Sequence, residues 1–258
     1  MIGIAAGMAA KGKTVFAHTM ANFLTLRACE MIRDDIVYNR FNAKIVASYA
    51  SVLGGPWGST HHGLEDVGVM RTIPGMTIVV PADTTEVKRV AAAAVDFDGP
   101  MYIRLEADVP VYAADDDHEF KVGGSVVLRE GKDITLMAYG AMVGRSLAAA
   151  RILSDKGVEA RVVNMHTVKP IDEQAILDAA DHTRAIVTVE EHNIIGGLGS
   201  GVAEFIAEKV PGIRMKRIGF EDIFSILGKY ENILEHYGLD PAGIARTSLA
   251  FHAMKPTG

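Results

Sequence analysis

Short apolar runs alternate with amphipathic stretches along most of this 258-residue chain. Seven segments are predicted to be strands, and they lie at Lys44–Ala50, Thr77–Val80, Met101–Leu105, Ile134–Tyr139, Ala160–Asn164, Ala185–Glu190 and Met215–Ile218. Helices are predicted after Asp83, which suits an N-cap, and at Met1–Ala10, Phe16–Arg33, Val143–Leu153, Asp172–Ala180, Val202–Glu208 and Lys229–Ala250. This alternation predicts an α/β fold with mostly parallel sheets flanked by helices.

Between residues 107 and 121 the apolar periodicity disappears. The segment ADVPVYAADDDHEFK is polar, acidic and contains a proline, a composition that suits a connection between domains. We therefore predict two α/β domains, at residues 1–110 and 121–258, joined by a linker at residues 111–120. Each domain is expected to hold a mostly parallel sheet flanked by helices.

The bulk composition excludes several classes of protein. Apolar residues make up 49% and charged residues 22%, values typical of a folded globular chain. The formal charge of −6 and the lack of a basic stripe argue against a nucleic-acid partner. No apolar run reaches the roughly 18 residues of a membrane span. The single cysteine, Cys29, excludes an internal disulfide framework, so a cytoplasmic location is predicted.

The predicted helix at Phe16–Arg33 carries Met20 and Phe23 on one side. This side is either a buried apolar stripe or a wall against which a flat ring could stack. The sequence alone leaves both interpretations open.

The segment Gly54–Asp66 is the richest candidate for chemistry. It places four glycines, the only tryptophan and the adjacent His61 and His62 between a predicted strand and helix. Ligands of open α/β sheets bind beyond the carboxyl ends of strands, so either histidine could donate a proton or a hydrogen bond to a substrate hydroxyl. Because no third ligand lies at a suitable spacing, no metal site is predicted.

A third candidate is the glycine-rich segment at residues 188–201, TVEEHNIIGGLGSG. Its glycines precede a predicted helix and could cradle a phosphate at the helix N-terminus. Their spacing does not fit the dinucleotide fingerprint, and no acidic ribose partner follows. Close packing of the backbone is the preferred interpretation.

The order of the motifs resembles the transketolase family, in the stretch shared by its pyrimidine-binding and C-terminal domains. The motifs that carry the resemblance are GIAAGMAAKG, FLTLRACEMIR, GSTHHGLEDVGVMRTIPGMTIVVPAD, ITLMAYG, VKPID, VTVEEHNIIGGLGSGVAE and HYGLDPAGIA. They run through essentially the whole chain. The chain is most similar to the split transketolases, in which two polypeptides make up one enzyme.

The resemblance implies roles for particular residues. A phenylalanine at the position of Phe23 stacks on the aminopyrimidine of thiamine diphosphate, and Met20 occupies a neighbouring position. His61 is implied to reach the cofactor and the reacting donor sugar. The segment Glu190–Gly199 is implied to be structural.

Three departures from the family pattern concern the substrate. Trp57 stands where an acidic residue usually reads a donor hydroxyl, and Tyr49 aligns with a histidine that commonly contacts the acceptor. A phosphate-binding arginine aligns near Ala107, with Arg104 close by. We therefore expect Tyr49, Trp57, His62 and Arg104 to contact a sugar or sugar phosphate whose anion is recognised in an unusual way.

The resemblance also implies partners. No diphosphate-binding sequence is present, so thiamine diphosphate is expected to be shared with an N-terminal subunit that holds the diphosphate and Mg²⁺ or Ca²⁺. Homodimerisation into an α2β2 assembly is expected. The implied activity is transfer of a two-carbon ketol unit between sugars.

The start of the chain is unusual for this family. The family's cofactor-activating glutamate falls just before the segment that matches Met1–Ile4, and the first helix lacks a capping residue. We expect the natural protein to extend upstream by roughly 40–60 residues, enough for a further βα unit.

Two alternative functions are open at this point. The β-subunit of a 2-oxoacid dehydrogenase shares the layout, although the Thr-His-His loop favours a transketolase. A non-catalytic assembly subunit would retain the fold without chemistry, and Trp57, Tyr49 and the missing glutamate support that alternative.

Overall fold

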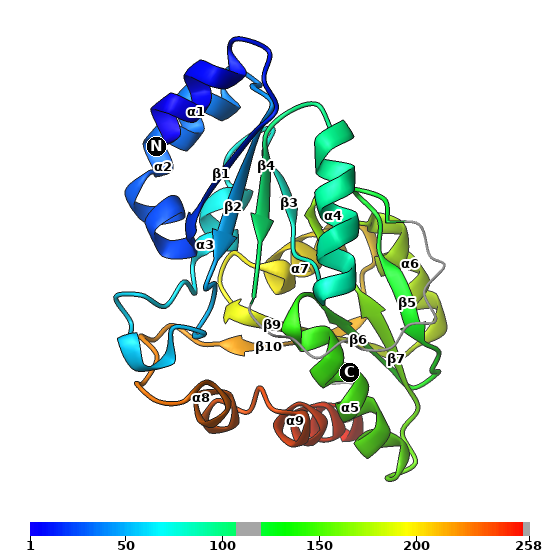
Figure 1. The fold of residues 1–258 in the computed structure, drawn as a ribbon. Helices are drawn as coiled ribbons and strands as arrows, with labels where there is room; N and C mark the ends of the chain where they lie inside the picture. Colours follow the sequence, from blue (N-terminus) through cyan, green and yellow to red (C-terminus); the bar gives the residue numbers. More distant parts are fainter. Residues whose placement is uncertain (107–119, 255–258) are drawn as a thin grey trace.

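The computed structural model describes residues 1–106 and 120–254, which form two five-stranded sheets (Figure 1). The first sheet has the strand order β1-β2-β4-β3-β8, and the second has the order β10-β9-β6-β7-β5. The α/β architecture predicted from the alternating pattern is thus confirmed. Apart from Phe120, the predicted linker at 111–120 lies outside the described residues.

Four strands of the first sheet run parallel. They are β1 (Val15–Met20), β2 (Ala43–Ser48), β4 (Met101–Arg104) and β3 (Thr77–Val79). The fifth, β8 (Thr167–Lys169), comes from the C-terminal half and pairs antiparallel with β3. The ammonium of Lys169 donates to the carbonyls of Arg71 and Ile73, both at 2.7 Å. The two halves of the chain therefore share one sheet.

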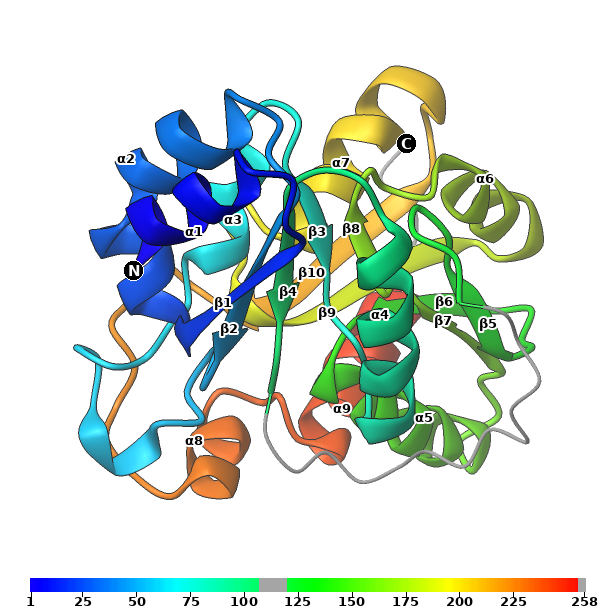
Figure 2. The same cartoon turned by 45° about the horizontal axis from the view of Figure 1, so that its top comes forward.

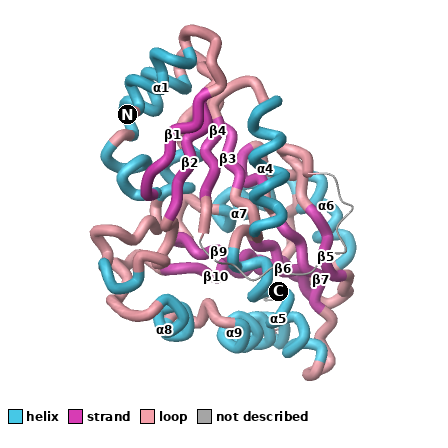
Figure 3. The backbone as a smooth tube through the Cα atoms, in the orientation of Figure 1, coloured by secondary structure: helices cyan, strands magenta, loops and turns pink. Residues whose placement is uncertain are grey.

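The second sheet repeats this plan. The parallel strands are β10 (Arg214–Phe220), β9 (Ala185–Asn193), β6 (Ile134–Ala138) and β7 (Ala160–Asn164). The edge strand β5 (Val126–Arg129) pairs antiparallel with β7. Figure 3 shows the two sheets in one view, with helices along their outer sides.

Helices cover the sheets on both faces. Their bounds are α1 Ile2–Ala9, α2 Cys29–Met31, α3 Asp66–Arg71, α4 Thr84–Asp96, α5 Ala141–Ser154, α6 Glu173–His182, α7 Leu198–Lys209, α8 Tyr230–His236 and α9 Pro241–Ala253. The N-cap predicted at Asp83 is confirmed, since its carboxylate accepts the Glu86 backbone N–H at 2.8 Å. Within the described residues, no helix is long and apolar enough to cross a membrane.

The packing of the first sheet follows the two-residue period of its strands. Ile45, Ala47 and Tyr102 face a core shared with α1 and α3. Met101 and Ile103 face the opposite side, where α4 packs (Figure 2). The core on the α1 side continues through α7 to the second sheet, so apolar packing joins the two halves.

Two predicted elements differ from the structure. The helix predicted at Lys229–Ala250 is divided into α8 and α9 at residues 237–240. The helix predicted at Phe16–Arg33 begins only after Met20, because Val15–Met20 is strand β1. Val15 and Ala17 are buried while Phe16 and His18 are exposed, an alternation with the period of a strand. After β1, the chain forms the π-helical turns Phe23–Arg27 and Ile32–Val37 on either side of the short α2.

Candidate active site

The carboxyl ends of β1 and β2 meet at one edge of the first sheet. Met20, the last residue of β1, is level with Ser48, the last residue of β2. Immediately beyond, Tyr49 and Ser51 have φ angles of +49° and +60°. Such angles are uncommon in residues with a side chain, and strained conformations tend to cluster at functional sites. The sharp turn directs the chain into a protruding loop at residues 52–62.

This loop, called here the His61 loop, closes on itself. At its neck Ser51 and Gly63 exchange two backbone hydrogen bonds of 2.9 Å each. The amide of Asn22 donates to the Thr60 carbonyl at 2.6 Å, which ties the loop to the end of β1. A Cβ on Gly63 would lie 3.2 Å from the Cβ of Ala21, so glycine allows this close approach.

Four aromatic side chains lie in a row across this edge, and we call them the ring row. The Phe23 and His61 ring centroids are 5.4 Å apart with planes at 68°, and His61 and Trp57 are 5.9 Å apart at 61°. Tyr49 follows at 5.2 Å from Trp57. Trp57 is 52% exposed and Tyr49 41%. Exposed rings set at an angle to one another offer faces to a flat ligand.

His61 is half-buried at the centre of the ring row. Its Nδ1 lies 3.0 Å from the Thr60 hydroxyl, which fixes the orientation of the ring. The other nitrogen, Nε2, is the one that can exchange a proton or a hydrogen bond with a ligand. Met20 is also half-buried, at the end of β1, and completes the apolar side of the edge.

His62 points away from the ring row and is only 4% exposed. Its Nδ1 lies 2.5 Å from the Ser225 hydroxyl and its Nε2 3.2 Å from the Gly55 carbonyl. Burial lowers the pKa of His62, so its imidazole is neutral at pH 7. Residues 225–228 also press on the loop, because a Cβ on Gly55 would lie 2.6 Å from the Gly228 carbonyl. The C-terminal half therefore holds the loop from behind.

Arg104 lies under the loop in a buried network. Its side chain is fully buried; Nε donates to Asp66 at 2.8 Å, and Nη1 pairs with Glu106. Nη2 donates to the Glu191 carbonyl at 2.9 Å. The Tyr102 hydroxyl donates to the same Asp66 carboxylate at 2.6 Å. This guanidinium links β4 and α3 of the first half to β9 of the second.

The glycine-rich turn before α7 is filled by the chain itself. Both carboxylate oxygens of Glu190 accept backbone N–H groups, from Leu198 and Gly199, at 2.8 Å each. A Cβ on Gly197 would lie 1.9 Å from the Glu190 carboxylate. Burial raises the pKa of Glu190 to about 7. The glycines allow this close packing, and Glu190 occupies the helix N-terminus that a phosphate would need.

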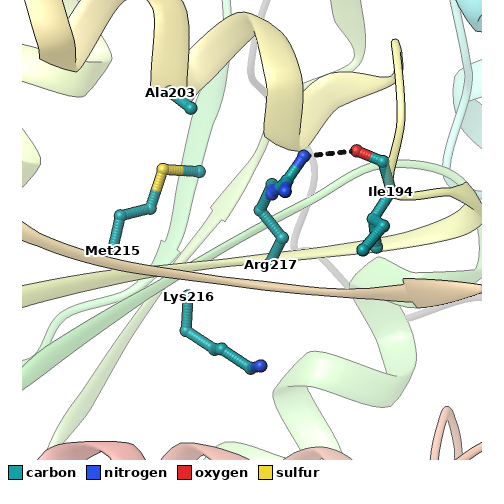
Figure 4. Close-up of a pocket in the computed structure, with 5 residues that line it drawn as sticks. All are labelled: Ile194, Ala203, Met215, Lys216 and Arg217. Carbon is teal, nitrogen blue, oxygen red and sulfur yellow. Dashed lines mark hydrogen bonds between the residues drawn. The ribbon is translucent and has the colours of Figure 1, made fainter. Parts of the chain in front are cut away.

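A separate surface pocket of about 330 Å³ lies beside β10 and α7 (Figure 4). It is lined by Ile194, Ala203, Met215, Lys216 and Arg217. The Arg217 guanidinium is engaged by the Ile194 carbonyl at 2.7 Å, and Lys216 points away from it on the other side of the strand. None of the predicted site residues lines this pocket. In the described part of the chain, no three His, Cys, Asp or Glu side chains gather as a metal site would.

The structure brings together some of the residues singled out in the sequence and separates others. Phe23, His61, Trp57 and Tyr49 form the ring row, with Met20 at the same edge. His62 and Arg104 are buried behind it, and their surroundings favour structural roles. Their predicted contact with a substrate stays untested.

Sequence reasoning missed the residues that support the loop from a distance. The supporting residues are Asn22, Ser51, Glu191 and Ser225. Ser225 is 163 positions from its partner His62, so no local pattern could have indicated this contact. Only Glu191 lay within a motif, next to the glutamate that fills the glycine turn.

Comparison with known protein families matches each half of the chain to a domain of one family. The family model described as "Transketolase, pyrimidine binding domain" matches residues 1–108. The model described as "Transketolase, C-terminal domain" matches residues 123–244.

Similar proteins cover nearly the whole chain. A subunit of the apulose-4-phosphate transketolase of Phocaeicola vulgatus is 40% identical over 251 residues, 97% of this chain and 80% of that protein. A 6-deoxy-6-sulfo-D-fructose transketolase subunit of Clostridium sp. is 40% identical over 248 residues, 96% of this chain and 77% of the relative. A solved structure described as "Split gene transketolase, inactive beta4 tetramer" superposes with a TM-score of 0.90 at 40% identity, covering 98% of this chain and 81% of that one.

Proposed function

The chain belongs to the transketolase family, of which it forms a C-terminal portion, and from this premise we propose that it transfers a two-carbon ketol unit between sugars together with a separate N-terminal subunit. The observation that carries the proposal is the ring row at the carboxyl edge of the first sheet. That edge is where open α/β sheets bind ligands.

The ring row fits one part of thiamine diphosphate. Phe23 and Met20 offer an apolar wall for the aminopyrimidine, and the Arg27 guanidinium, 4.6 Å above the Phe23 ring, is exposed and free to swing aside. When bound, the cofactor supplies the carbanion chemistry. His61 holds a hydrogen bond or moves a proton at Nε2, toward a donor hydroxyl.

The described residues do not fit the remainder of the cofactor. No cluster of acidic or histidine side chains could hold its metal ion, and the helix N-terminus at Leu198 is already taken by Glu190. We therefore assign the diphosphate and Mg²⁺ or Ca²⁺ to the N-terminal subunit, in an α2β2 assembly. The relative described as an inactive β4 tetramer supports the need for that partner. A cytoplasmic location stays a prediction.

Substrate recognition is proposed to occur at the Trp57 and Tyr49 end of the row. Exposed aromatic faces there would pack on the carbon skeleton of a sugar, where the family more often places acidic and histidine side chains. The relatives act on a phosphorylated and a sulfonated sugar by their names. Because Arg104 is buried, we place the group that binds a substrate anion on the N-terminal subunit.

The assembly itself gives the first test. The isolated chain should neither bind thiamine diphosphate in the presence of Mg²⁺ nor turn over sugars, because it offers only the pyrimidine wall. Addition of the N-terminal subunit should produce both binding and turnover, measured by calorimetry and by a coupled ketol-transfer assay. Micromolar cofactor binding by this chain alone would contradict the proposal.

Phe23→Ala should weaken cofactor binding in the assembled enzyme. Ring stacking contributes about 0.5–1.5 kcal/mol beyond area burial, so the dissociation constant should rise about 2- to 12-fold. The rate at saturating cofactor should change much less. Phe16→Ala is the matched control, because Phe16 is an exposed phenylalanine at the opposite end of β1. Equal cofactor affinity in both variants would remove Phe23 from the site.

A further inference from the structure

The neck of the His61 loop rests on a buried carboxyl group from the C-terminal half. Ser51 lies in a left-handed conformation, and its hydroxyl is buried beside the Glu191 carboxyl. Glu191 belongs to β9 and is fully buried. Its Oε2 accepts the Tyr230 hydroxyl at 2.6 Å, which brings in α8. The side chains of Ser51, Glu191 and Tyr230 thus connect the loop neck to both β9 and α8.

Two buried polar atoms at this junction lack a hydrogen-bond partner. Among the described residues, neither Ser51 Oγ nor Glu191 Oε1 makes a hydrogen bond of good geometry. The Ser51 hydroxyl is near enough to favour the charged form of Glu191. An unpaired buried polar group is costly. A hydrogen bond between Ser51 Oγ and Glu191 Oε1 would satisfy both atoms.

We propose that Glu191 is a positioning residue, which holds Ser51 against Tyr230 and thereby sets the position of the His61 loop over the cofactor edge. This inference rests on the proposed function only for its effect on turnover. The effect of Glu191 on the position of the His61 loop does not depend on the proposed function.

The charged and titratable groups around Glu191 determine whether its carboxyl is protonated or ionised when it contacts Ser51 at the neck of the His61 loop. Glu106, which follows β4, opposes ionisation of Glu191, while Arg104 of β4 and Arg145 of α5 favour it. Asp66 of α3 adds negative charge beside Glu106. Burial is the largest effect and raises the pKa of Glu191 to about 8, so the group carries a proton at pH 7. A protonated carboxyl can donate to Ser51 through Oε1 while Oε2 accepts from Tyr230.

The direction of the pH effect follows from this. The pKa of Glu191 in the folded chain is above that of an exposed glutamate, so the folded state binds the extra proton. The stabilisation is complete below the ordinary glutamate pKa and is lost as pH rises through about 8. Above that pH, Glu191 and Glu106 repel each other in a buried junction, and we expect water to enter and the loop neck to loosen.

The only tryptophan of the chain reports on the loop directly. Trp57 lies at the loop tip, and its emission and acrylamide quenching can be measured on the full 258-residue chain without partner or cofactor. Measurements between about pH 7 and 9.5 avoid the range in which imidazoles ordinarily titrate. The wild-type chain should show a quenching increase centred near pH 8. Glu191→Gln, which mimics the protonated form, should show no such increase, and Glu191→Ala should be quenched strongly throughout.

Glu190→Gln is the matched control. Glu190 is equally buried on the same strand but contacts the turn before α7. It should keep the wild-type pH transition even if it unfolds more easily. A transition that persists in Glu191→Gln, or equal Trp57 changes in Glu190→Gln and Glu191→Ala, would overturn the inference.

The assembled enzyme separates this inference from the proposed function. Misplaced catalytic groups can cost on the order of 10²-fold in rate, so Glu191→Ala should lower kcat by 10- to 100-fold, roughly, at unchanged cofactor saturation. The wild-type enzyme should lose turnover as pH rises through about 8, whereas Glu191→Gln should keep near-normal turnover both at pH 7 and above that pH. If the Trp57 signals follow expectation while turnover is unaffected, the positioning of the loop stands and its proposed role in catalysis fails. If His61→Ala abolishes turnover but the emission and quenching of Trp57 are the same in every Glu191 variant as in the wild type, only the positioning inference fails.

Discussion

His61→Ala should reduce the kcat of the assembled enzyme on the order of 10²- to 10⁴-fold, the usual contribution of a positioned proton-transfer group. Its imidazole lies at the centre of the ring row and is oriented by Thr60 at 3.0 Å. The free energy of unfolding should change by less than about 1 kcal/mol, because a half-exposed loop side chain contributes little to the core. Steady-state kinetics and urea unfolding of the same preparation measure both effects.

His18→Ala is the matched control for this variant. His18 is an exposed histidine on β1 and lies outside the ring row. It should leave both kcat and stability near the wild-type values. A His61→Ala protein that loses stability while each folded molecule keeps full turnover would assign His61 a structural role.

The larger part of the fold could be predicted from the sequence because most of its strands are buried on both faces. Each of the seven predicted strands coincides with an observed strand to within a few residues, and Asp83 caps α4 as its chemistry suggests. Parallel strands flanked by helices need apolar residues at nearly every position, and such runs are easy to recognise.

Strand β1, which was predicted as part of a helix, is not buried on both faces. It lies at the edge of the sheet, where Phe16 and His18 are exposed, and its sequence VFAHTM contains no continuous apolar run. The helical spacing of Met20, Phe23 and Leu24 then extended the predicted helix too far toward the N-terminus. The strands β5 and β8 escaped prediction because they are short additions at sheet edges, and tertiary pairing decides them.

The candidate site shows the same contrast between features set by local sequence and features set by tertiary contacts. The candidate residues His61 and Trp57 could be singled out in the sequence, because a pair of adjacent histidines and the only tryptophan share one short segment. Residues that contact the loop from the other half of the chain could not. Arg104 pairs with Asp66 and Glu106 and donates to the Glu191 carbonyl, and its contact with a substrate stays a prediction. A sequence shows that an arginine exists, and only the fold shows which carboxylates it meets.

Arg104→Met should destabilise the folded chain by about 3–5 kcal/mol, because removal of one member of a buried ion cluster leaves the others uncompensated. Arg104 is fully buried and joins Asp66, Glu106 and the Glu191 carbonyl, so both halves should lose stability together. Urea unfolding followed by circular dichroism measures the loss. Arg129→Met, which breaks the partly exposed pair of Arg129 and Glu159, is the matched control and should cost much less.

The pH dependence of the Arg104→Met loss identifies its cause. Burial raises the pKa of Glu106, and the Arg104 charge opposes that rise. Without Arg104 the pKa of Glu106 should rise further, so the folded variant would bind a proton that the unfolded chain releases at neutral pH. Its stability should therefore recover as pH falls toward the ordinary glutamate range near 4.3. Glu106→Gln added to Arg104→Met should recover part of the loss at pH 8 by removing the buried charge. A penalty that is independent of pH and unchanged in the double variant would mean that Arg104 acts through packing of its side chain rather than through charge.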